Sequence, residues 1–164
     1  LAAYFTRGSG HNEKALYSEK PDDYKNMLDR LAKKYETARK FVPKPVQEGA
    51  GAEIGILAYG TSHWGVIEAR DALEKEGVKT DYLRMRALPF HEDVKTFLEK
   101  HPRTYVVEQN RDGQMASLLK VEYPHLAAKI RSVLHYDGLP LDAASVVNGI
   151  RSQEGRKAAA GGAK

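Results

Sequence analysis

Short apolar runs alternate with amphipathic stretches along most of the chain after residue 51. The apolar runs predict strands over residues 54–59, 78–85, 103–108 and 130–136. The stretches that follow them repeat apolar residues every three or four positions, which predicts helices over residues 63–76, 91–100, 114 to about 122, and 141–151. Repeated strand–helix units require a mainly parallel sheet with helices on both faces. We therefore expect an α/β protein with three layers, α/β/α.

A separate amphipathic stretch precedes these units. Pro21 predicts a helix start, and Asp22 and Asp23 in the first turn suit the positive end of the helix dipole. Apolar residues fall on one face at helical spacing, and we expect this face to be packed rather than to hold a cofactor. Its members are Tyr24, Met27, Leu28, Leu31, Tyr35 and Ala38.

The composition between and after these regions predicts three parts. Residues 42–51 are rich in proline and glycine, which indicates an extended linker and a domain boundary. We therefore expect residues 1–50 to be the end of a preceding domain with a helix and linker, and residues 51–152 to be a compact domain. Residues 153–164 (QEGRKAAAGGAK) are of low complexity and are expected to be disordered. The absence of an initial methionine and a strand-like segment at residues 1–5 predict that the chain is a fragment.

Composition excludes several classes of function. The 164 residues include no cysteine, which excludes disulfides, cysteine-ligated zinc, iron–sulfur ligation and thiol nucleophiles within the chain. No apolar run approaches the ~18 residues of a membrane span. The net charge is +4, but the basic residues are dispersed and do not form the continuous stripe that nucleic-acid binding needs. We therefore expect neither a membrane nor a nucleic-acid partner.

Polar residues follow two of the predicted strands and form a candidate binding site. After residues 104–107 the chain turns polar at Glu108, Gln109, Asn110, Arg111 and Asp112. In open α/β sheets ligands bind outside the carboxyl ends of the strands. The alternative is a solvated loop in which Asp112 caps the following helix.

The run Gly60-Thr61-Ser62 joins another strand to a helix. Free backbone N–H groups at such a helix start can bind an anion, although no known phosphate fingerprint is matched. Thr61 or Ser62 as a simple N-cap is the alternative.

Two arginines and a histidine-containing run are further candidates. Arg84 and Arg86 share one side of a strand end and could hold phosphate or carboxylate, or else form an ion pair with Glu108 or Asp112. The run His91-Glu92-Asp93 contains metal-ligand types, but acids are favoured at a helix start in any case. No nucleophile is paired with a histidine in a recognisable motif. We therefore predict no metal site and no catalytic residue, and a structural role for the strand-end run His135-Tyr136-Asp137-Gly138.

Four ordered motifs together resemble one known family. The chain is similar to the C-terminal region of the α subunit of 2-oxoacid:ferredoxin oxidoreductases, especially the 2-oxoglutarate type. The motifs are Thr6-Arg7-Gly8-Ser9-Gly10-His11-Asn12-Glu13, Arg86-Ala87-Leu88-Pro89-Phe90, Glu108-Gln109-Asn110-Arg111-Asp112-Gly113-Gln114 and Ser132-Val133-Leu134-His135-Tyr136-Asp137-Gly138-Leu139-Pro140-Leu141. The resemblance covers nearly everything from Thr6 to about Ser152.

The resemblance implies a transketolase C-terminal-like domain in a cytoplasmic enzyme. Such an enzyme decarboxylates a 2-oxo acid on thiamine diphosphate with Mg²⁺, passes the acyl group to coenzyme A, and sends electrons through iron–sulfur clusters to ferredoxin. The implied partners are a β subunit and N-terminal domains of the α chain. The family's Gly-Asp-Gly motif for the magnesium diphosphate is missing here, so the fragment alone is expected to be inactive.

The expected topology suggests how this domain contributes. We assign Gly60, Thr61 and Ser62 to the diphosphate of coenzyme A, Arg84 or Arg86 to its charge, and Gln109, Asn110 and Arg111 to adenine or pantetheine polar atoms. Two alternatives stay open: a purely structural domain at a subunit interface, and a basic module that binds nucleotides or nucleic acid.

Overall fold

The computed structural model describes residues 8–155, and the chain divides into two compact units between Val42 and Pro43. The first unit contains a loop and helix α1 (Pro21–Ala38). The second contains a five-stranded sheet and its covering helices. Of the helices in residues 8–155, none is both long enough and apolar enough to cross a membrane.

The sheet of the second unit is mainly parallel. Its strands are β1 (Val46–Glu48), β2 (Ile54–Tyr59), β3 (Thr80–Met85), β4 (Arg103–Glu108) and β5 (Ile130–Leu134). Their order is β1-β3-β2-β4-β5, and β1 alone runs antiparallel to its neighbour. The connecting helices are α2 (Ser62–Lys75), α3 (Glu92–Lys100), α4 (Gln114–Glu122), the 3₁₀ helix η1 (Pro124–Lys129) and α5 (Ala143–Gln153).

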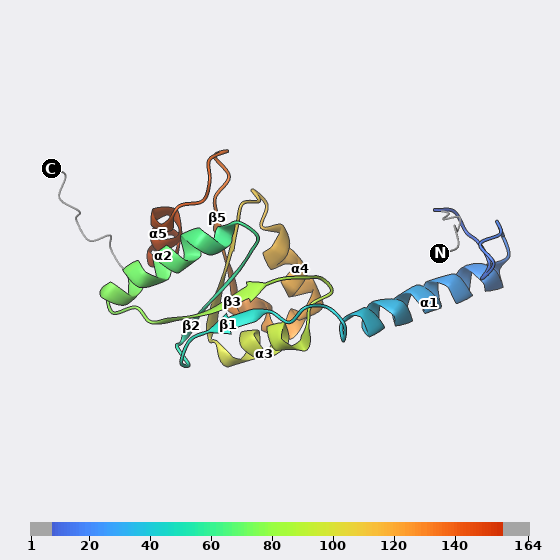
Figure 1. Cartoon of the computed structure of the whole chain (residues 1–164), viewed down its shortest axis with the longest axis horizontal. Helices are drawn as coiled ribbons and strands as arrows, with labels where there is room; N and C mark the ends of the chain where they lie inside the picture. The colour runs from blue at the N-terminus through green and yellow to red at the C-terminus, as the bar shows by residue number, and fades with distance from the viewer. Residues whose placement is uncertain (1–7, 156–164) are drawn as a thin grey trace. The chain divides into compact units, whose positions relative to one another are not determined.

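Two separate apolar cores lie on the two faces of this sheet. Successive residues of β2 alternate between them, with Ile56 in one core and Leu57 in the other, both fully buried. Helices α2 and α5 cover the first core and pack side by side (Figure 1), whereas α3, α4 and η1 cover the second. The predicted three-layer α/β/α architecture is confirmed.

The edge strand β1 corrects the predicted domain boundary. Val46–Glu48 pairs with β3 in the register Val46 to Arg84, so part of the expected linker belongs to the sheet. The carboxylate of Asp81 accepts hydrogen bonds from the backbone N–H groups of Ala50 and Ala52, at 3.1 and 3.0 Å, and orders the loop after β1. All three residues of β1 are exposed, so the strand carries no hydrophobic pattern that the sequence could reveal.

The carboxyl-terminal boundary also differs from the prediction. Gln153, expected in a disordered tail, is the last residue of α5, and its side chain donates to the carbonyl of Ser132 at 2.9 Å. Glu154 forms an ion pair with Arg103 at 2.8 Å. These contacts to the sheet hold both residues in place. Residues 156–164 of the predicted tail, and the strand expected at residues 1–5, lie outside the described residues.

In the first unit, the start of α1 at Pro21 agrees with the prediction, but the environment of its apolar face does not. The helix contains no buried residue. Tyr24, Leu28, Leu31 and Tyr35 are each 45–52% exposed, so the face that was expected to be packed is open. From the preceding loop, the hydroxyl of Ser18 donates a hydrogen bond to the carboxylate of Asp23 at 2.6 Å.

The order of the strands makes β2 and β4 the topological switch point of the sheet. From β2 the chain passes through α2 to β3 on one side, and from β4 it passes through α4 to β5 on the other. Helices α2 and α4 therefore lie on opposite faces. The loops that leave these two adjacent strands diverge, and such a switch point is where open α/β sheets bind ligands.

Candidate functional site

The loops after β2 and β4 meet at this switch point. The side-chain nitrogen of Gln109 donates to the hydroxyl oxygens of Thr61, at 3.3 Å, and Ser62, at 3.4 Å. Gly60 has φ of +58°, a conformation that glycine adopts without strain and that turns the chain from β2 into α2. The structure therefore brings together four of the predicted residues from segments nearly fifty positions apart.

The first turn of α2 has no side-chain cap. Thr61 occupies the N-cap position, but its hydroxyl makes no capping hydrogen bond, and its backbone is in the right-handed helical region. Ser62 is nearly buried, whereas Gly60 and Thr61 are exposed. Thr61 is therefore the N-cap residue by position, as the alternative had it, but its side chain does not cap the helix. The N–H groups of this turn remain available to an anionic ligand.

The start of α4 is arranged differently, around a buried carboxylate. Glu108 is fully buried at the end of β4 and accepts hydrogen bonds from the backbone N–H groups of Met115, at 2.9 Å, and Ala116, at 3.1 Å. Gly113, at the N-cap position, has φ of +60° and offers no side chain. Glu108 thus takes the capping role that the sequence assigned to Asp112, and that prediction is wrong.

Asn110 links this carboxylate to the end of β2. Its side-chain nitrogen donates to Glu108 at 2.9 Å and to the hydroxyl of Tyr59 at 2.8 Å. Burial and the nearby charge of Glu108 raise the pKa of Tyr59, so its phenol stays protonated at neutral pH. Asn110 is therefore positioned by the protein itself, in contrast to the exposed Gln109 beside it.

Arg111 is exposed and paired with its neighbour. Its guanidinium contacts the carboxylate of Asp112 through two hydrogen bonds, of 2.8 and 3.0 Å. This bond raises the pKa of Arg111. The carboxylate of Asp112 already compensates the positive charge of Arg111. A phosphate would have to replace this exposed carboxylate, which weakens the case for a phosphate contact.

The two predicted arginines differ in position: Arg84 lies in β3 near His63 of α2, whereas Arg86 follows the last residue of that strand. They do not pair with Glu108 or Asp112, so that predicted alternative is wrong. Arg86 is exposed, and no ion pair to it occurs within residues 8–155. Burial and the charge of Arg84 lower the pKa of His63, which hydrogen-bonds to the hydroxyl of Tyr82 at 3.1 Å. Positive charge therefore lies near the open start of α2.

The other two helix starts of the sheet domain carry side-chain caps. Asp142 accepts from the N–H of Ser145 at 2.7 Å and caps α5. His91, which is buried, accepts from the N–H of Asp93 at 3.2 Å and caps α3. Among the four helices α2 to α5, only α2 lacks a side-chain acceptor for its first N–H groups.

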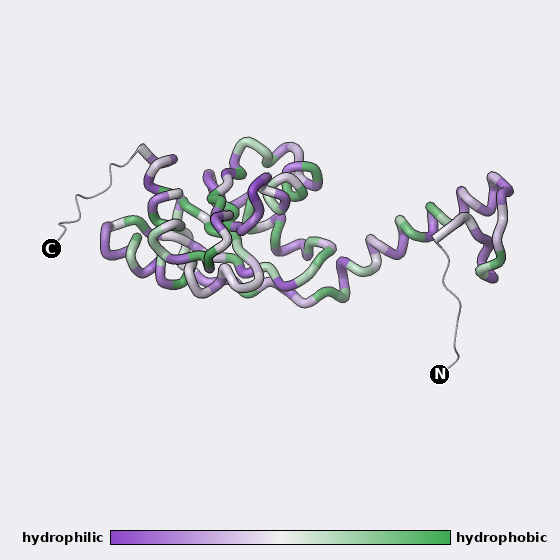
Figure 2. The backbone as a smooth tube through the Cα atoms, turned by 90° about the horizontal axis from the view of Figure 1, so that it is seen from above, coloured by the Kyte–Doolittle hydropathy of each residue, from purple (hydrophilic) through white to green (hydrophobic). Residues whose placement is uncertain are grey.

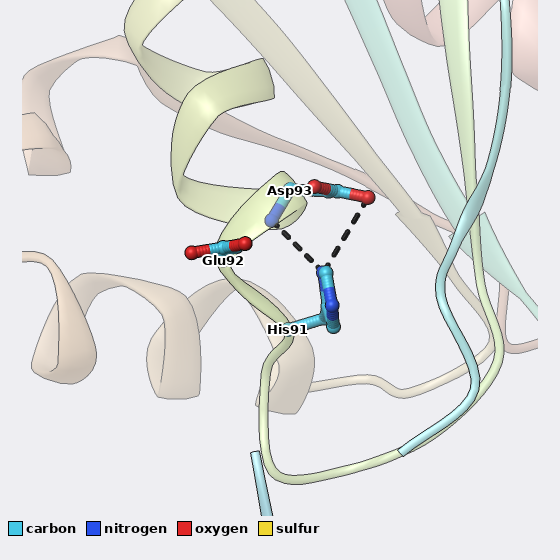
Figure 3. Close-up of side chains that lie close together, drawn as sticks. All are labelled: His91, Glu92 and Asp93. Atoms are coloured by element: carbon cyan, nitrogen blue, oxygen red, sulfur yellow. Dashed lines mark hydrogen bonds and ion pairs between the residues drawn. The ribbon is translucent and has the colours of Figure 1, made fainter. Parts of the chain in front are cut away.

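The run His91-Glu92-Asp93 brings three ligand-type atoms within 4.8 Å of one another. Figure 3 shows the two interactions among them: His91 contacts both the backbone and the carboxylate of Asp93. Nδ1 of His91 accepts the capping hydrogen bond, and Glu92 and Asp93 lie in the first turn of α3. The structure therefore explains this run as a helix start, in line with the sequence argument.

Sequence reasoning missed the roles of Glu108 and Tyr59. The available signal was a glutamate as the last residue of a strand, followed by a glycine immediately before the helix. The sequence reasoning also missed several large apolar side chains that are exposed in the loop after β5 and in the first turn of α2. Trp64 is 73% exposed, Leu139 67% and Tyr136 62%.

Comparison with known proteins gives relatives of one kind. No model of a known protein family matches the chain. Over 151 residues, 88% of the chain, it is 28% identical to 2-oxoacid:ferredoxin oxidoreductase 2, subunit alpha, from Aeropyrum pernix. It is 26% identical over 155 residues to the 2-oxoacid:ferredoxin oxidoreductase subunit alpha of Saccharolobus solfataricus. The chain spans only 23% and 24% of these relatives' lengths.

Solved structures share the fold. A 2-oxoglutarate:ferredoxin oxidoreductase from Magnetococcus marinus, solved with 2-oxoglutarate, coenzyme A and succinyl-CoA bound, matches 93% of the chain and 27% of its own, with a TM-score of 0.77 and 23% identity. A split-gene transketolase, in an inactive β4 tetramer, matches 66% of the chain and 41% of its own, with a TM-score of 0.57 and 18% identity. The predicted resemblance and the transketolase-like fold are confirmed.

Proposed function

We propose that this chain, a relative of the α subunits of 2-oxoacid:ferredoxin oxidoreductases, is the C-terminal part of such a subunit in a cytoplasmic enzyme. The enzyme oxidatively decarboxylates a 2-oxo acid, with 2-oxoglutarate as the proposed substrate, to an acyl-CoA. Its partners are a β subunit, the N-terminal domains of the α chain, and ferredoxin. The support is the pair of α-subunit relatives that align with 88% of the chain.

We assign the redox and decarboxylation cofactors to other parts of this enzyme. The chain has no cysteine to ligate an iron–sulfur cluster. Asp112 and Asp137 precede glycines, but they follow Arg111 and Tyr136, so neither matches the Gly-Asp-Gly motif of a magnesium–thiamine diphosphate site. The residues present do not fit these cofactors, and the fragment alone is expected to be inactive.

We assign to this domain a part in binding coenzyme A. The observation that carries the assignment is the open start of α2 beside Gln109 at the switch point of the sheet. A diphosphate fits the N–H groups and hydroxyls of Gly60, Thr61 and Ser62, because a helix start favours negative charge. We assign the positive charge to Arg84, which lies near His63 of α2, or to Arg86, and the amide of Gln109 suits adenine or pantetheine polar atoms.

The contacts of Asn110 and Arg111 make these two residues weaker candidates for binding coenzyme A. Asn110 holds Glu108 and Tyr59, so its main contribution is to fix the loop that carries Gln109. Arg111 would have to exchange Asp112 for a phosphate, which reduces its expected gain. We therefore place Gln109, Thr61 and Ser62 ahead of Asn110 and Arg111 as ligand contacts.

The test is the variant Gln109→Ala in the complete enzyme, with Gln47→Ala on the exposed strand β1 as matched control. Loss of a neutral hydrogen bond costs about 0.5–1.5 kcal/mol, so the KM for coenzyme A should rise roughly two- to tenfold. Release of CO₂ from the 2-oxo acid before acyl transfer should not change. Unchanged KM values in both variants would remove the strand-end loops from the coenzyme A site.

One observation favours a second candidate, a subunit-interface function. The exposed apolar side chains of Trp64, Tyr136 and Leu139 belong to the first turn of α2 and to the loop after β5. Apolar side chains of this size near a site are typical of surfaces covered by another protein. If Gln109→Ala lowered both half-reactions equally and weakened association of the α and β subunits, this interface function would replace coenzyme A binding.

A further inference from the structure

Helix α1 carries a regular apolar seam that the other described residues of the first unit do not cover. Within Pro21–Ala38 the seam residues alternate at spacings of three and four, the a and d positions of a heptad. In order they are Pro21, Tyr24, Leu28, Leu31, Tyr35 and Ala38. Figure 2 shows hydrophobic and hydrophilic segments alternating along this helix.

The preceding loop packs beside this seam and does not cover it. The cavity that the loop forms with α1 is lined on the helix by Asp23, Asn26, Met27 and Arg30, which are c, f, g and c positions. The four large seam side chains keep about half of their surface exposed. Because most helix stability in proteins comes from packing of an amphipathic face, such a seam requires a partner.

The charges beside the seam define the partner. The e and g positions flank the seam and decide which helices pair. The charged residues at these positions, including the two that adjoin the helix ends, are all basic: Lys20, Lys25, Lys34 and Arg39. The acidic residues Asp22, Asp29 and Glu36 recur at the b position, and of these Glu36 forms an ion pair with Arg39 at 3.1 Å.

This pattern opposes pairing of two copies of α1. A parallel pair would place Lys34 against Arg39 of the other copy, and an antiparallel pair would place Lys25 against Arg39. Like charges at these positions destabilise a complex. The pattern also opposes adsorption on an anionic membrane, because α1 contains four acidic and four basic residues and its net charge is zero.

We propose that α1 docks a helix of a partner chain whose apolar seam is flanked by glutamate or aspartate at its own e and g positions. The seam supplies the buried apolar area, and Lys25 and Lys34 supply selectivity through ion pairs at its borders. This interaction site is separate from the strand-end loops and does not depend on coenzyme A binding.

The experiment measures binding of this chain to two synthetic helical peptides of about three heptads, with leucine at a and d. One carries glutamate at e and g, and the other carries lysine. The chain should bind the glutamate peptide roughly tenfold more tightly or better, and the preference should weaken as salt screens the pairs. Titration of each peptide, fluorescently labelled, at low and high salt gives the preference between the peptides and its dependence on salt.

Variants of surface charges test the proposed ion pairs with little risk of unfolding the chain. The double variant Lys25→Glu, Lys34→Glu should reverse the preference between the peptides, whereas Lys33→Glu, at the outward f position, should leave it unchanged. Leu28→Asp should abolish binding of both peptides with helix content retained by circular dichroism. Equal affinity for the two peptides, a dimer of the chain in sedimentation, or binding only to anionic vesicles would each overturn the proposal.

Discussion

Helices α2 and α4 begin at neighbouring places in the fold but in opposite ways. Each follows one of two adjacent parallel strands, β2 and β4, at the same edge of the sheet. The start of α4 is closed by the buried carboxylate of Glu108, which accepts two backbone hydrogen bonds. The start of α2 has no side-chain acceptor and carries the hydroxyls that Gln109 contacts.

This difference between the two helix starts assigns a stabilising role to the start of α4 and a binding role to the start of α2. Backbone N–H groups at a helix start need an acceptor, and a protein can supply that acceptor itself or leave the place to a ligand or to water. At α4 the carboxylate of Glu108 already accepts the hydrogen bonds that the helix start could otherwise donate to a bound anion. At α2 the equivalent place is open, and we propose that the diphosphate of coenzyme A fills it.

The largest expected effect is on α4. Glu108→Ala removes two hydrogen bonds to a charged group and leaves buried N–H groups without an acceptor, so it should lower the free energy of unfolding by about 3–5 kcal/mol. Urea unfolding measures this loss, and Glu68→Ala, an exposed position on α2, serves as control. A loss below about 1 kcal/mol would show that the carboxylate is not the structural cap.

At α2 a new carboxylate should harm binding without harming the fold. Thr61→Asp puts a negative charge in the place proposed for phosphate, which should raise the KM for coenzyme A roughly ten- to hundredfold in the complete enzyme. The same charge suits the helix dipole, so stability should stay equal or rise by about 0.3–1 kcal/mol. Thr61→Asn, which adds no charge, should have a much smaller effect on KM; equal effects would argue against a phosphate there.

A smaller effect is expected from the link between the two strand ends. Asn110→Ala removes the hydrogen bonds to Glu108 and Tyr59 and should lower the free energy of unfolding by about 1–2 kcal/mol. Thermal unfolding can compare it with Asn148→Ala on the exposed side of α5. If the two variants were equally stable, Asn110 would not position this loop.

The smallest expected effect is on alkaline stability. The pKa of Tyr59 is raised by burial and by Glu108, so the folded protein holds this proton more tightly than the unfolded chain. The contribution is therefore fully present below about pH 10, the ordinary tyrosine pKa, and is lost as pH rises through the folded value. Tyr59→Phe should flatten the decline of stability with alkaline pH; an unchanged slope would place the titration elsewhere.

The sequence predicted the edge of the sheet that carries the site better than it predicted the contacts within it. Parallel strands deliver their following loops to one edge, so Thr61 and Gln109 could be assigned to the same edge from periodicity alone. That β2 lies directly beside β4 depends on strand order, which local periodicity does not encode. The choice of Glu108 over Asp112 as cap depends on which carboxylate is buried, a property of the packed core.

The strand β1 and the exposure of the apolar face of α1 also could not be predicted from the sequence. The strand Val46–Glu48 is short, exposed and preceded by Pro43 and Pro45, so only its pairing with β3 reveals it. The apolar face of α1 has the pattern of a packed helix, and periodicity reports that a face will be covered without reporting by which chain. Within the first unit, no described residue covers it.

The most direct test is hydrogen–deuterium exchange of the complete enzyme with and without saturating coenzyme A. The amides of Thr61, Ser62 and His63 should exchange rapidly in the free enzyme and slowly in the complex. Those of Met115 and Ala116, already bonded to Glu108, should be slow in both. Unchanged exchange at the start of α2 on coenzyme A binding would contradict the proposed division between the two helix starts.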